Sequence, residues 1–138
     1  MEKHFAATAY IVSKIGRELK VLLHRHKKLN IWIGVGGHVE KGEDPEQTVV
    51  REIKEETDLE ITIVNHLLPF CIQEEKIPKY KKEAAHCHID FIYFALAKNP
   101  ENIRMEEEHG WFSLKDLGKM DLPQEAKYAA QNAIKAFL

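Results

Sequence analysis

Glu52, Glu55 and Glu56 are the residues whose type and spacing best suit chemistry. Intervals of three and four positions place their carboxylates on one face of a helix, within about one turn. Like charges this close repel one another, so such a cluster is typical of a site where a cation lies among them. Hard divalent cations such as Mg²⁺ and Mn²⁺ take oxygen ligands and bridge to substrate phosphates. The spacing alone equally fits a solvated acidic helix face.

The sequence before these glutamates predicts the helix that must carry them. Asp44 can cap its first turn, Pro45 suits the first helical position, and Gln47 can complete a capping box. The face opposite the acids is expected to pack inward through three aliphatic residues, Val49, Val50 and Ile53.

A glycine-rich segment precedes the helix. Residues 34–42 contain four glycines, which favour a loop over a helix or strand. Glycine permits positive φ angles and a close approach of the backbone to a ligand. A glycine loop, a capped helix and a one-turn carboxylate cluster in succession form a far more specific signal than any of the three alone.

The segment Gly37–Leu59 resembles the Nudix box, the signature of the Nudix hydrolase family. That pattern is G, five residues, E, seven residues, REUxEExGU, where U is a bulky aliphatic residue. The matching positions are Gly37, Glu43, Arg51, Glu52, Ile53, Glu55, Glu56 and Leu59. Asp58 stands where the family has a glycine that ends the helix in a left-handed turn. Asp tolerates that conformation better than most residues, so the change concerns local stability more than chemistry.

The family resemblance implies an α/β fold, an α/β/α sandwich around a central mixed β-sheet. Hydrophobic patterning predicts strands at residues 6–15, 19–24, 31–33, 59–71, 86–97 and 109–112. The charged segment 73–83, which contains Pro78, is predicted to be a loop or a mobile hairpin. Ser113 is expected to cap a short helical turn, and residues 122–138 to form a final amphipathic helix.

Length and composition limit the classes of protein that fit. A chain of 138 residues is expected to form one domain over residues 1–138. The net charge of −2 and the absence of a basic stripe argue against nucleic acid as the main partner. No membrane-spanning apolar run or signal peptide is evident, so a cytoplasmic location is expected. Cys71 and Cys87 lack metal-site spacing and are predicted to be reduced.

The resemblance also implies a reaction, the hydrolysis of a nucleoside diphosphate linked to a moiety X. Its products are a nucleoside monophosphate and phosphorylated X. The expected cofactor is Mg²⁺ or Mn²⁺, which neutralises phosphate charge and lowers the pKa of a bound water. Glu52 and Glu56 are the leading metal ligands, and the carbonyl of Gly37 commonly joins them. Glu55 is expected to act as a further ligand or as the general base.

Other residues have supporting roles in this prediction. Arg51 and Glu43 resemble an ion pair that positions the carboxylates. Glu40, beside the glycine loop, is a candidate for water-mediated or substrate contact. The general base is the least determined role, because family members also supply it from a later loop. The candidates from that source here are Glu106–Glu108, with Glu107 at the centre, and Glu74 and Glu75.

Two further groups are candidates for substrate binding. Arg25 lies in a short basic run with His26, Lys27 and Lys28, which either meets phosphates or forms a solvated turn. His88 alternates with His86 and Asp90 on one strand face. That face could line the substrate cleft or hold zinc, but a complete zinc site needs ligands from elsewhere, because one strand brings only neighbours together.

Substrate identity depends on residues outside the box. A nucleotide is the expected small-molecule partner, with a damaged nucleoside triphosphate as one candidate. An alternative is a nucleotide-sensing Nudix-like module that binds without turnover, although such modules often lose box glutamates that this chain keeps. A structural domain with an acidic helix would leave the glycine loop unexplained. A homodimer is compatible with the resemblance, although no feature of the sequence indicates one.

Overall fold

The computed structural model describes residues 1–64 and 68–138 of the chain. Its strands are β1 (Glu2–Ile15), β2 (Glu18–His26), β3 (Ile31–Ile33), β4 (Val35–His38), β5 (Ile61–Ile63), β6 (Cys71–Ile77), β7 (His86–Ala97) and β8 (His109–Phe112). Its helices are α1 (Pro45–Thr57), α2 (Leu114–Lys119) and α3 (Gln124–Lys135), with a 3₁₀ turn at Pro100–Asn102.

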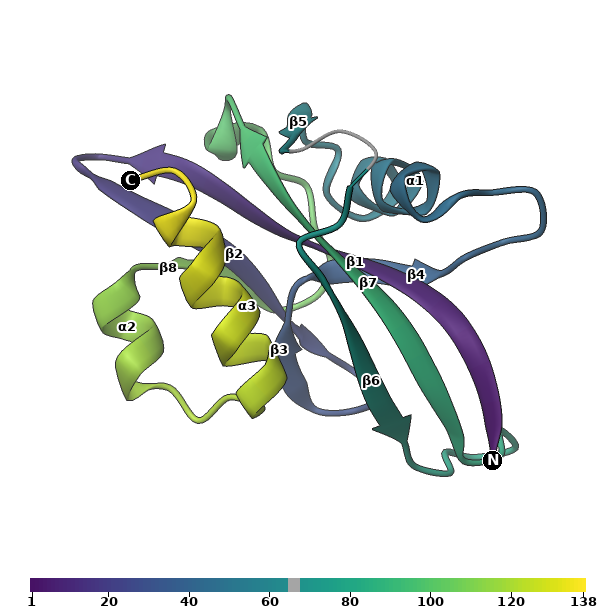
Figure 1. Ribbon diagram of the computed structural model, residues 1–138. Helices are drawn as coiled ribbons and strands as arrows, with labels where there is room; N and C mark the ends of the chain where they lie inside the picture. Colours follow the sequence, from purple (N-terminus) through teal and green to yellow (C-terminus); the bar gives the residue numbers. More distant parts are fainter. Residues whose placement is uncertain (65–67) are drawn as a thin grey trace.

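A mixed sheet lies at the centre of the molecule. The main strand order is β3-β2-β1-β7-β5, with β4 paired to β1, β6 to β7 and β8 to β2. The long central strands β1 and β7 run parallel, whereas their other pairings are antiparallel. Helix α1 covers one face of this sheet, and α2 and α3 lie on the other (Figure 1). The predicted α/β/α sandwich with a mixed sheet is therefore confirmed.

Alternation along β1 divides the core into two layers. Ala9 and Ile11 pack with Val49 and Ile53 on the α1 face. The opposite face of the same strand packs against α2 and α3 through a second cluster, which includes Tyr10, Val12, Leu117, Ala129, Ala133 and Ile134. Each helix thus has an apolar stripe buried against the sheet, which fixes the position of α1 and its acids.

Three details of the structure differ from the main prediction. Val50 does not pack inward and is 47% exposed, because the buried stripe of α1 runs through Thr48, Val49, Ile53 and Thr57. The predicted strand over 59–71 is divided, because β5 ends at Ile63 and the next strand, β6, begins at Cys71. Residues 65–67 of that predicted strand lie outside the described residues. The segment 73–83 holds the end of β6 and the start of the connection to β7, which pairs with β6 antiparallel, so of the two predicted alternatives the structure has the hairpin. The charged side chains of Glu74 and Lys76 are exposed on this strand, while Gln73 and Ile77 are buried.

The glycine segment is also more ordered than predicted, because part of it forms β4 against β1. A Cβ atom at Gly36 would lie 2.1 Å from the carbonyl oxygen of Ala7, so only glycine permits this approach. Of the four glycines, only Gly42 has a positive φ, at 86°. Close packing, more than unusual dihedral angles, explains the composition of this segment.

Helix α1 begins as predicted. The Asp44 side chain accepts a hydrogen bond from the Gln47 N–H at 2.8 Å, and the Gln47 side chain accepts one from the Asp44 N–H at 2.9 Å. The helix ends at Asp58, which adopts the left-handed conformation with φ 58° and ψ 17°. Its N–H donates to the carbonyls of Ile53 and Lys54, and its carboxylate pairs with the Lys54 ammonium. Asp58 therefore performs the glycine's capping role.

Within the described residues, no helix combines the length and apolar character that a membrane crossing requires. Cys71 and Cys87 are free thiols, as predicted. The single domain over residues 1–138 stays a prediction.

We expect Asp58→Gly to raise the thermal unfolding midpoint by roughly 2–4 °C, because glycine adopts the left-handed conformation without a Cβ clash. Asp58→Val should lower the midpoint, since a β-branched residue is strained at this φ. Thermal unfolding followed by circular dichroism would measure both variants. A lower midpoint for both would mean that the Lys54–Asp58 ion pair outweighs the backbone effect.

Candidate functional site

The glycine strand lies directly against the acidic face of α1. A Cβ atom at Gly37 would lie 2.5 Å from Oε1 of Glu52, so the missing side chain leaves room for this carboxylate. Glu52 is nearly buried, with 14% of its side chain exposed, whereas the Glu55 side chain is 59% exposed. The structure therefore brings Gly37, Glu52 and Glu56 together and leaves Glu55 at the solvent edge of the cluster.

Arg51 is the cation of the cluster. Its Nε donates to Glu43 Oε2 at 2.7 Å and its Nη2 to Glu43 Oε1 at 3.1 Å, which is a bidentate pair. Its Nη1 donates to Glu52 Oε1 at 2.9 Å and to Glu55 Oε2 at 3.4 Å, and lies 3.5 Å from Glu40 Oε1. One guanidinium thus links four carboxylates.

Glu43 is held from three sides. The Glu40 N–H and the Thr48 hydroxyl donate to Oε1 of Glu43 at 3.0 and 2.9 Å, beside the Arg51 pair. Hydrogen bonds from Arg51, then from Glu40 and Thr48, lower the pKa of Glu43 to about 2. Thr48 is fully buried and was missed by the sequence analysis, although a hydroxyl on the apolar face of a predicted helix was a usable signal.

Glu56 has the opposite electrostatic environment. Burial, followed by the charges of Glu52 and Glu107, raises its pKa to about 8. Burial also raises the pKa of Glu52, against the effect of Arg51. One oxygen of Glu56, Oε2, is buried without a hydrogen-bond partner. A buried acceptor without a donor, beside a second buried carboxylate, is the environment that a bound cation would satisfy.

The residues present therefore fit a hard divalent cation. Glu52 and Glu56 supply carboxylate oxygens only, which suit Mg²⁺ or Mn²⁺ more than zinc or copper. Glu43 and Arg51 lie outside this pair and orient it, as supporting groups do around metal ligands.

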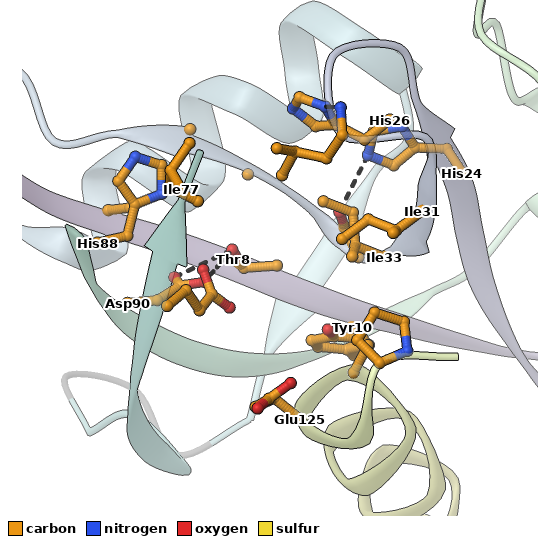
Figure 2. A pocket seen from close by; sticks show the side chains of 18 of the residues that line it. Thr8, Tyr10, His24, His26, Ile31, Ile33, Ile77, His88, Asp90 and Glu125 are labelled. Carbon is orange, nitrogen blue, oxygen red and sulfur yellow. Dashed lines mark hydrogen bonds between the residues drawn. The ribbon is translucent and has the colours of Figure 1, made fainter. Parts of the chain in front are cut away.

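A pocket of about 700 Å³ opens beside the cluster (Figure 2). Glu56, Glu107, Gly36 and Gly37 line its acidic end. Much of the remaining wall is apolar and comes from Tyr10, Leu29, Ile31, Ile33, Ile77, Pro78, Pro123 and Ala126. This volume lies within the range of about 300–1,000 Å³ that is usual for small-molecule sites.

A buried polar group lies among the strands that line the pocket. Asp90 is 3% exposed, and the single hydroxyl proton of Thr8 is shared between its Oδ1 and Oδ2, at 3.0 and 2.9 Å. Figure 2 shows both side chains and the hydrogen bonds between them. Burial and the adjacent Glu75 carboxylate raise the pKa of Asp90 well above its ordinary value. The pair therefore favours one shared proton and presents both donor and acceptor atoms to a ligand.

Glu107 is the member of the Glu106–Glu108 run that the fold turns toward the site. Its Oε2 lies 2.8 Å from Nδ1 of His24, whose Nε2 lies 3.0 Å from the Gly34 carbonyl oxygen. Glu106 and Glu108 are exposed. His24 is 3% exposed and was missed by the sequence analysis, although a lone histidine on an aliphatic strand was a signal. Glu74 and Glu75, the other candidate bases, line the pocket on β6.

The predicted substrate-binding residues separate into two groups. His88 and Glu107 line the pocket. Arg25 lies between two pocket residues of β2, so alternation turns it to the other side of the strand, where Nε donates to Asn30 Oδ1 at 2.9 Å. Glu40 is mainly exposed and lies near Arg51. Of the basic run, only His26 lines the pocket.

We expect Arg51→Lys to weaken Mg²⁺ binding by roughly 10–100-fold, because a lysine ammonium cannot pair with Glu43 in bidentate fashion while also contacting Glu52. Isothermal titration calorimetry would measure the affinity, with the exposed Arg104→Lys as the matched control. Equal Mg²⁺ affinity in both variants would exclude the supporting role of Arg51.

The raised pKa of Glu56 predicts a stability change with pH in metal-free protein. Between pH 4.5, the ordinary value, and about pH 8, the unfolded chain has released the proton of Glu56 while the folded chain retains it. The free energy of unfolding should therefore fall as pH rises through this window. Urea denaturation of Glu56→Gln should show a flatter pH dependence than the wild type or the exposed control Glu55→Gln. The same slope in all three proteins would refute the assignment.

Comparison with known proteins identifies the family. A model of the NUDIX domain matches residues 2–136. The chain is 32% identical over 117 residues to "Putative nudix hydrolase 1" of Caenorhabditis elegans, a match that covers 83% of this chain. The chain spans only 30% of the length of that relative.

Solved structures share the fold. A NUDIX-family hydrolase from Clostridium perfringens is similar with a TM-score of 0.82 and 26% identity, over 100% of both chains. An Ap4A hydrolase from C. elegans is similar with a TM-score of 0.70 and 24% identity, over 99% of this chain and 98% of that one. The family model covers nearly the whole sequence, and the box residues surround one acidic site beside a pocket. This chain belongs to the NUDIX domain family.

Proposed function

We propose that this protein is a divalent-metal-dependent pyrophosphohydrolase. Its substrate would be a nucleoside diphosphate linked to a moiety X, and its products a nucleoside monophosphate and phosphorylated X. The observation that carries the proposal is the pair of partly buried carboxylates, Glu52 and Glu56, with an unpartnered Glu56 oxygen at one end of a pocket that also has apolar walls. Such a site matches a ligand that is anionic at one end and flat and apolar at the other.

The chain's own residues would bind and orient the substrate's diphosphate. A bound Mg²⁺ or Mn²⁺ would supply charge neutralisation at the phosphates and a water of lowered pKa. Glu52 and Glu56 would hold it, with the Gly37 carbonyl as a further oxygen donor. Arg51 would keep Glu52 in place through its hydrogen bond and would keep its own position through Glu43.

Glu107 and Glu55 are the two best-placed candidates for the general base. Glu107 lines the pocket and is oriented by the 2.8 Å contact with His24, so its carboxylate has a fixed direction toward the acidic end. Glu55 is mainly exposed and within reach of Arg51 only at 3.4 Å. Fixed geometry favours Glu107 for accepting a proton from an attacking water.

The walls of the pocket favour a nucleobase away from the phosphates. Tyr10, Ile31 and Ile77 offer apolar surface to a ring, and Asp90 with Glu75 offers a carboxylate and a carboxylic acid to its ring edge. Nucleoside triphosphates, including damaged ones, fit this description. The likeness to a solved Ap4A hydrolase adds dinucleoside polyphosphates to the substrates to be tested.

A nucleotide-sensing module without turnover is the second candidate function. It would use the same pocket, but it would not need two buried carboxylates with a raised pKa. The retention of Glu52, Glu55, Glu56 and Arg51 in one connected cluster favours the hydrolase.

We expect Glu52→Gln and Glu56→Gln each to lower kcat by roughly 10²-fold or more, because each removes a negative charge from the cation site. The assay is phosphate or pyrophosphate release from a panel of nucleoside triphosphates, Ap4A and ADP-ribose, with Mg²⁺ or Mn²⁺. Glu60→Gln, on the exposed residue after α1, is the matched control and should keep wild-type rates.

Two results would contradict the proposal. Unchanged turnover in both glutamine variants, with folding verified by circular dichroism, would remove the acidic cluster from the reaction. Tight nucleotide binding by the wild type without turnover of any panel member would favour the sensing module.

A further inference from the structure

Four histidines gather on the sheet outside the acidic cluster. His4 comes from β1, His38 from β4, and His86 and His88 from β7. The ring centroids of His38 and His88 are 4.8 Å apart, and those of His4 and His86 are 4.9 Å apart. The centroids of His4 and His38, of His86 and His88, and of His38 and His86 are 5.6, 4.9 and 6.1 Å apart. We call these four residues the histidine cluster.

Strand register explains why they meet. Parallel pairing of β1 with β7 sets His4 opposite His88, and antiparallel pairing of β1 with β4 sets His38 opposite Ala6. His86 lies two residues before His88, so its side chain has the same direction. Pairing between strands therefore places His4 and His38 beside His86 and His88, which a single strand could not do. Asp90 is not part of the group, since it is bound to Thr8.

The ring nitrogens converge closely enough for a shared ligand. His4, His38 and His86 each offer a nitrogen, and the three atoms lie within 4.8 Å of one another. Ligands at a zinc–nitrogen distance of about 2.0–2.1 Å lie roughly 3.3 Å apart in a tetrahedral site, so modest ring rotations would close the geometry. The three strands behind the rings provide a rigid support.

Hydrogen bonding among the rings is incomplete. Nε2 of His88 lies 2.8 Å from Nε2 of His38 and 3.1 Å from Nε2 of His86. Nδ1 of His86 lies 3.0 Å from the Ala84 carbonyl, which can only accept, so Nδ1 carries the proton and Nε2 of the neutral ring has a lone pair. One nitrogen of His88 must therefore serve two contacts with at most one proton. A metal ion bound to His38 and His86 would replace these two contacts, with His88 as a neighbouring ring and not a ligand.

The surroundings also resemble those of bound metals. The carbonyl of Ala84 fixes the orientation of the His86 ring, and the Glu2 carboxylate contacts Nε2 of His4 at 2.9 Å. Metal-ligating histidines commonly donate their other nitrogen to such carbonyl or carboxylate groups. Burial and neighbouring rings lower the pKa of His88 to about 4.

We propose that the histidine cluster binds a late first-row divalent transition metal, with zinc as the test ion, through His4, His38 and His86. Imidazole suits Zn²⁺, Ni²⁺ and Cu²⁺, whereas Mg²⁺ prefers oxygen ligands, so this site is chemically distinct from the carboxylates of α1. The site does not depend on the proposed hydrolase function.

Zinc titration of the full chain, made without a histidine tag, tests the proposal. Calorimetry in excess Mg²⁺ on the Glu56→Gln background excludes binding at the acidic site. We expect one zinc ion to bind, with affinity lowered in His4→Gln and His86→Gln by more than the roughly 10–100-fold that loss of an outer contact costs. His109→Gln, on a histidine outside the cluster, is the matched control and should keep the affinity.

A second measurement keeps the test decisive if the buried His86 variant fails to fold. Long-range proton–nitrogen spectra should show zinc-dependent shifts of the ring nitrogens of His4, His38 and His86, with no such shifts on Mg²⁺ addition. The proposal is overturned if the wild type takes up no zinc in excess Mg²⁺. It is equally overturned if His4→Gln binds zinc as tightly as the control, or if the ring nitrogens do not respond.

Discussion

Repulsion among carboxylates is the constraint on which this structure depends. Helix α1 and its flanking loop bring Glu40, Glu43, Glu52 and Glu55 around a single cation, the guanidinium of Arg51. The planar fork of arginine can serve several acceptors at once, so the arrangement needs this residue type and not a lysine. Glu56 lies beyond its reach and is instead the group whose proton is retained. Charge in the site is therefore reduced in two ways, by the Arg51 guanidinium on one side and by a retained proton on Glu56, which lines the pocket, on the other.

The strands of the sheet place this acidic cluster beside a pocket. Strand β4 brings Gly37 against Glu52, and the absence of a side chain there leaves room for the carboxylate. The opposite wall comes from β6 and β7, with Asp90 buried among the strands. An anionic group at one end and a ring system at the other would then meet complementary surroundings. The same topology gathers the histidine cluster, which offers nitrogen atoms where α1 offers oxygen atoms.

These two groups illustrate how ligand chemistry separates metals on one scaffold. Buried carboxylates beside a phosphate-sized space suit a hard ion that keeps its waters. Imidazoles packed on a strand surface suit a softer ion that sheds them. Because the carboxylates extend from a helix and the imidazoles from strands, each set is held by a different element, and a substitution in one set need not disturb the other.

The sequence by itself determined the features that depend on near neighbours along the chain. The capping box at Asp44 and the shared face of Glu52 and Glu56 follow from helix geometry within a few residues. The left-handed turn at Asp58 was implied by the family resemblance, which has a glycine at that position. The hairpin at the start of the chain and the limits of β3, β7 and β8 follow from hydrophobic alternation and turn residues.

Only the tertiary structure decided what depends on pairing between distant segments. The charged segment after residue 71 became a strand because β7 satisfies its backbone, which local composition does not reveal. Glu107 was separated from Glu106 and Glu108 by the contact with His24, which lies 83 positions away. Asp90 bonds to Thr8 and not to its neighbouring histidines because of the register of β1 with β7. His38 contacts His88 because β4 and β7 both pair with β1. A pattern along one strand fixes the face on which a side chain lies, but long-range pairing chooses its neighbours.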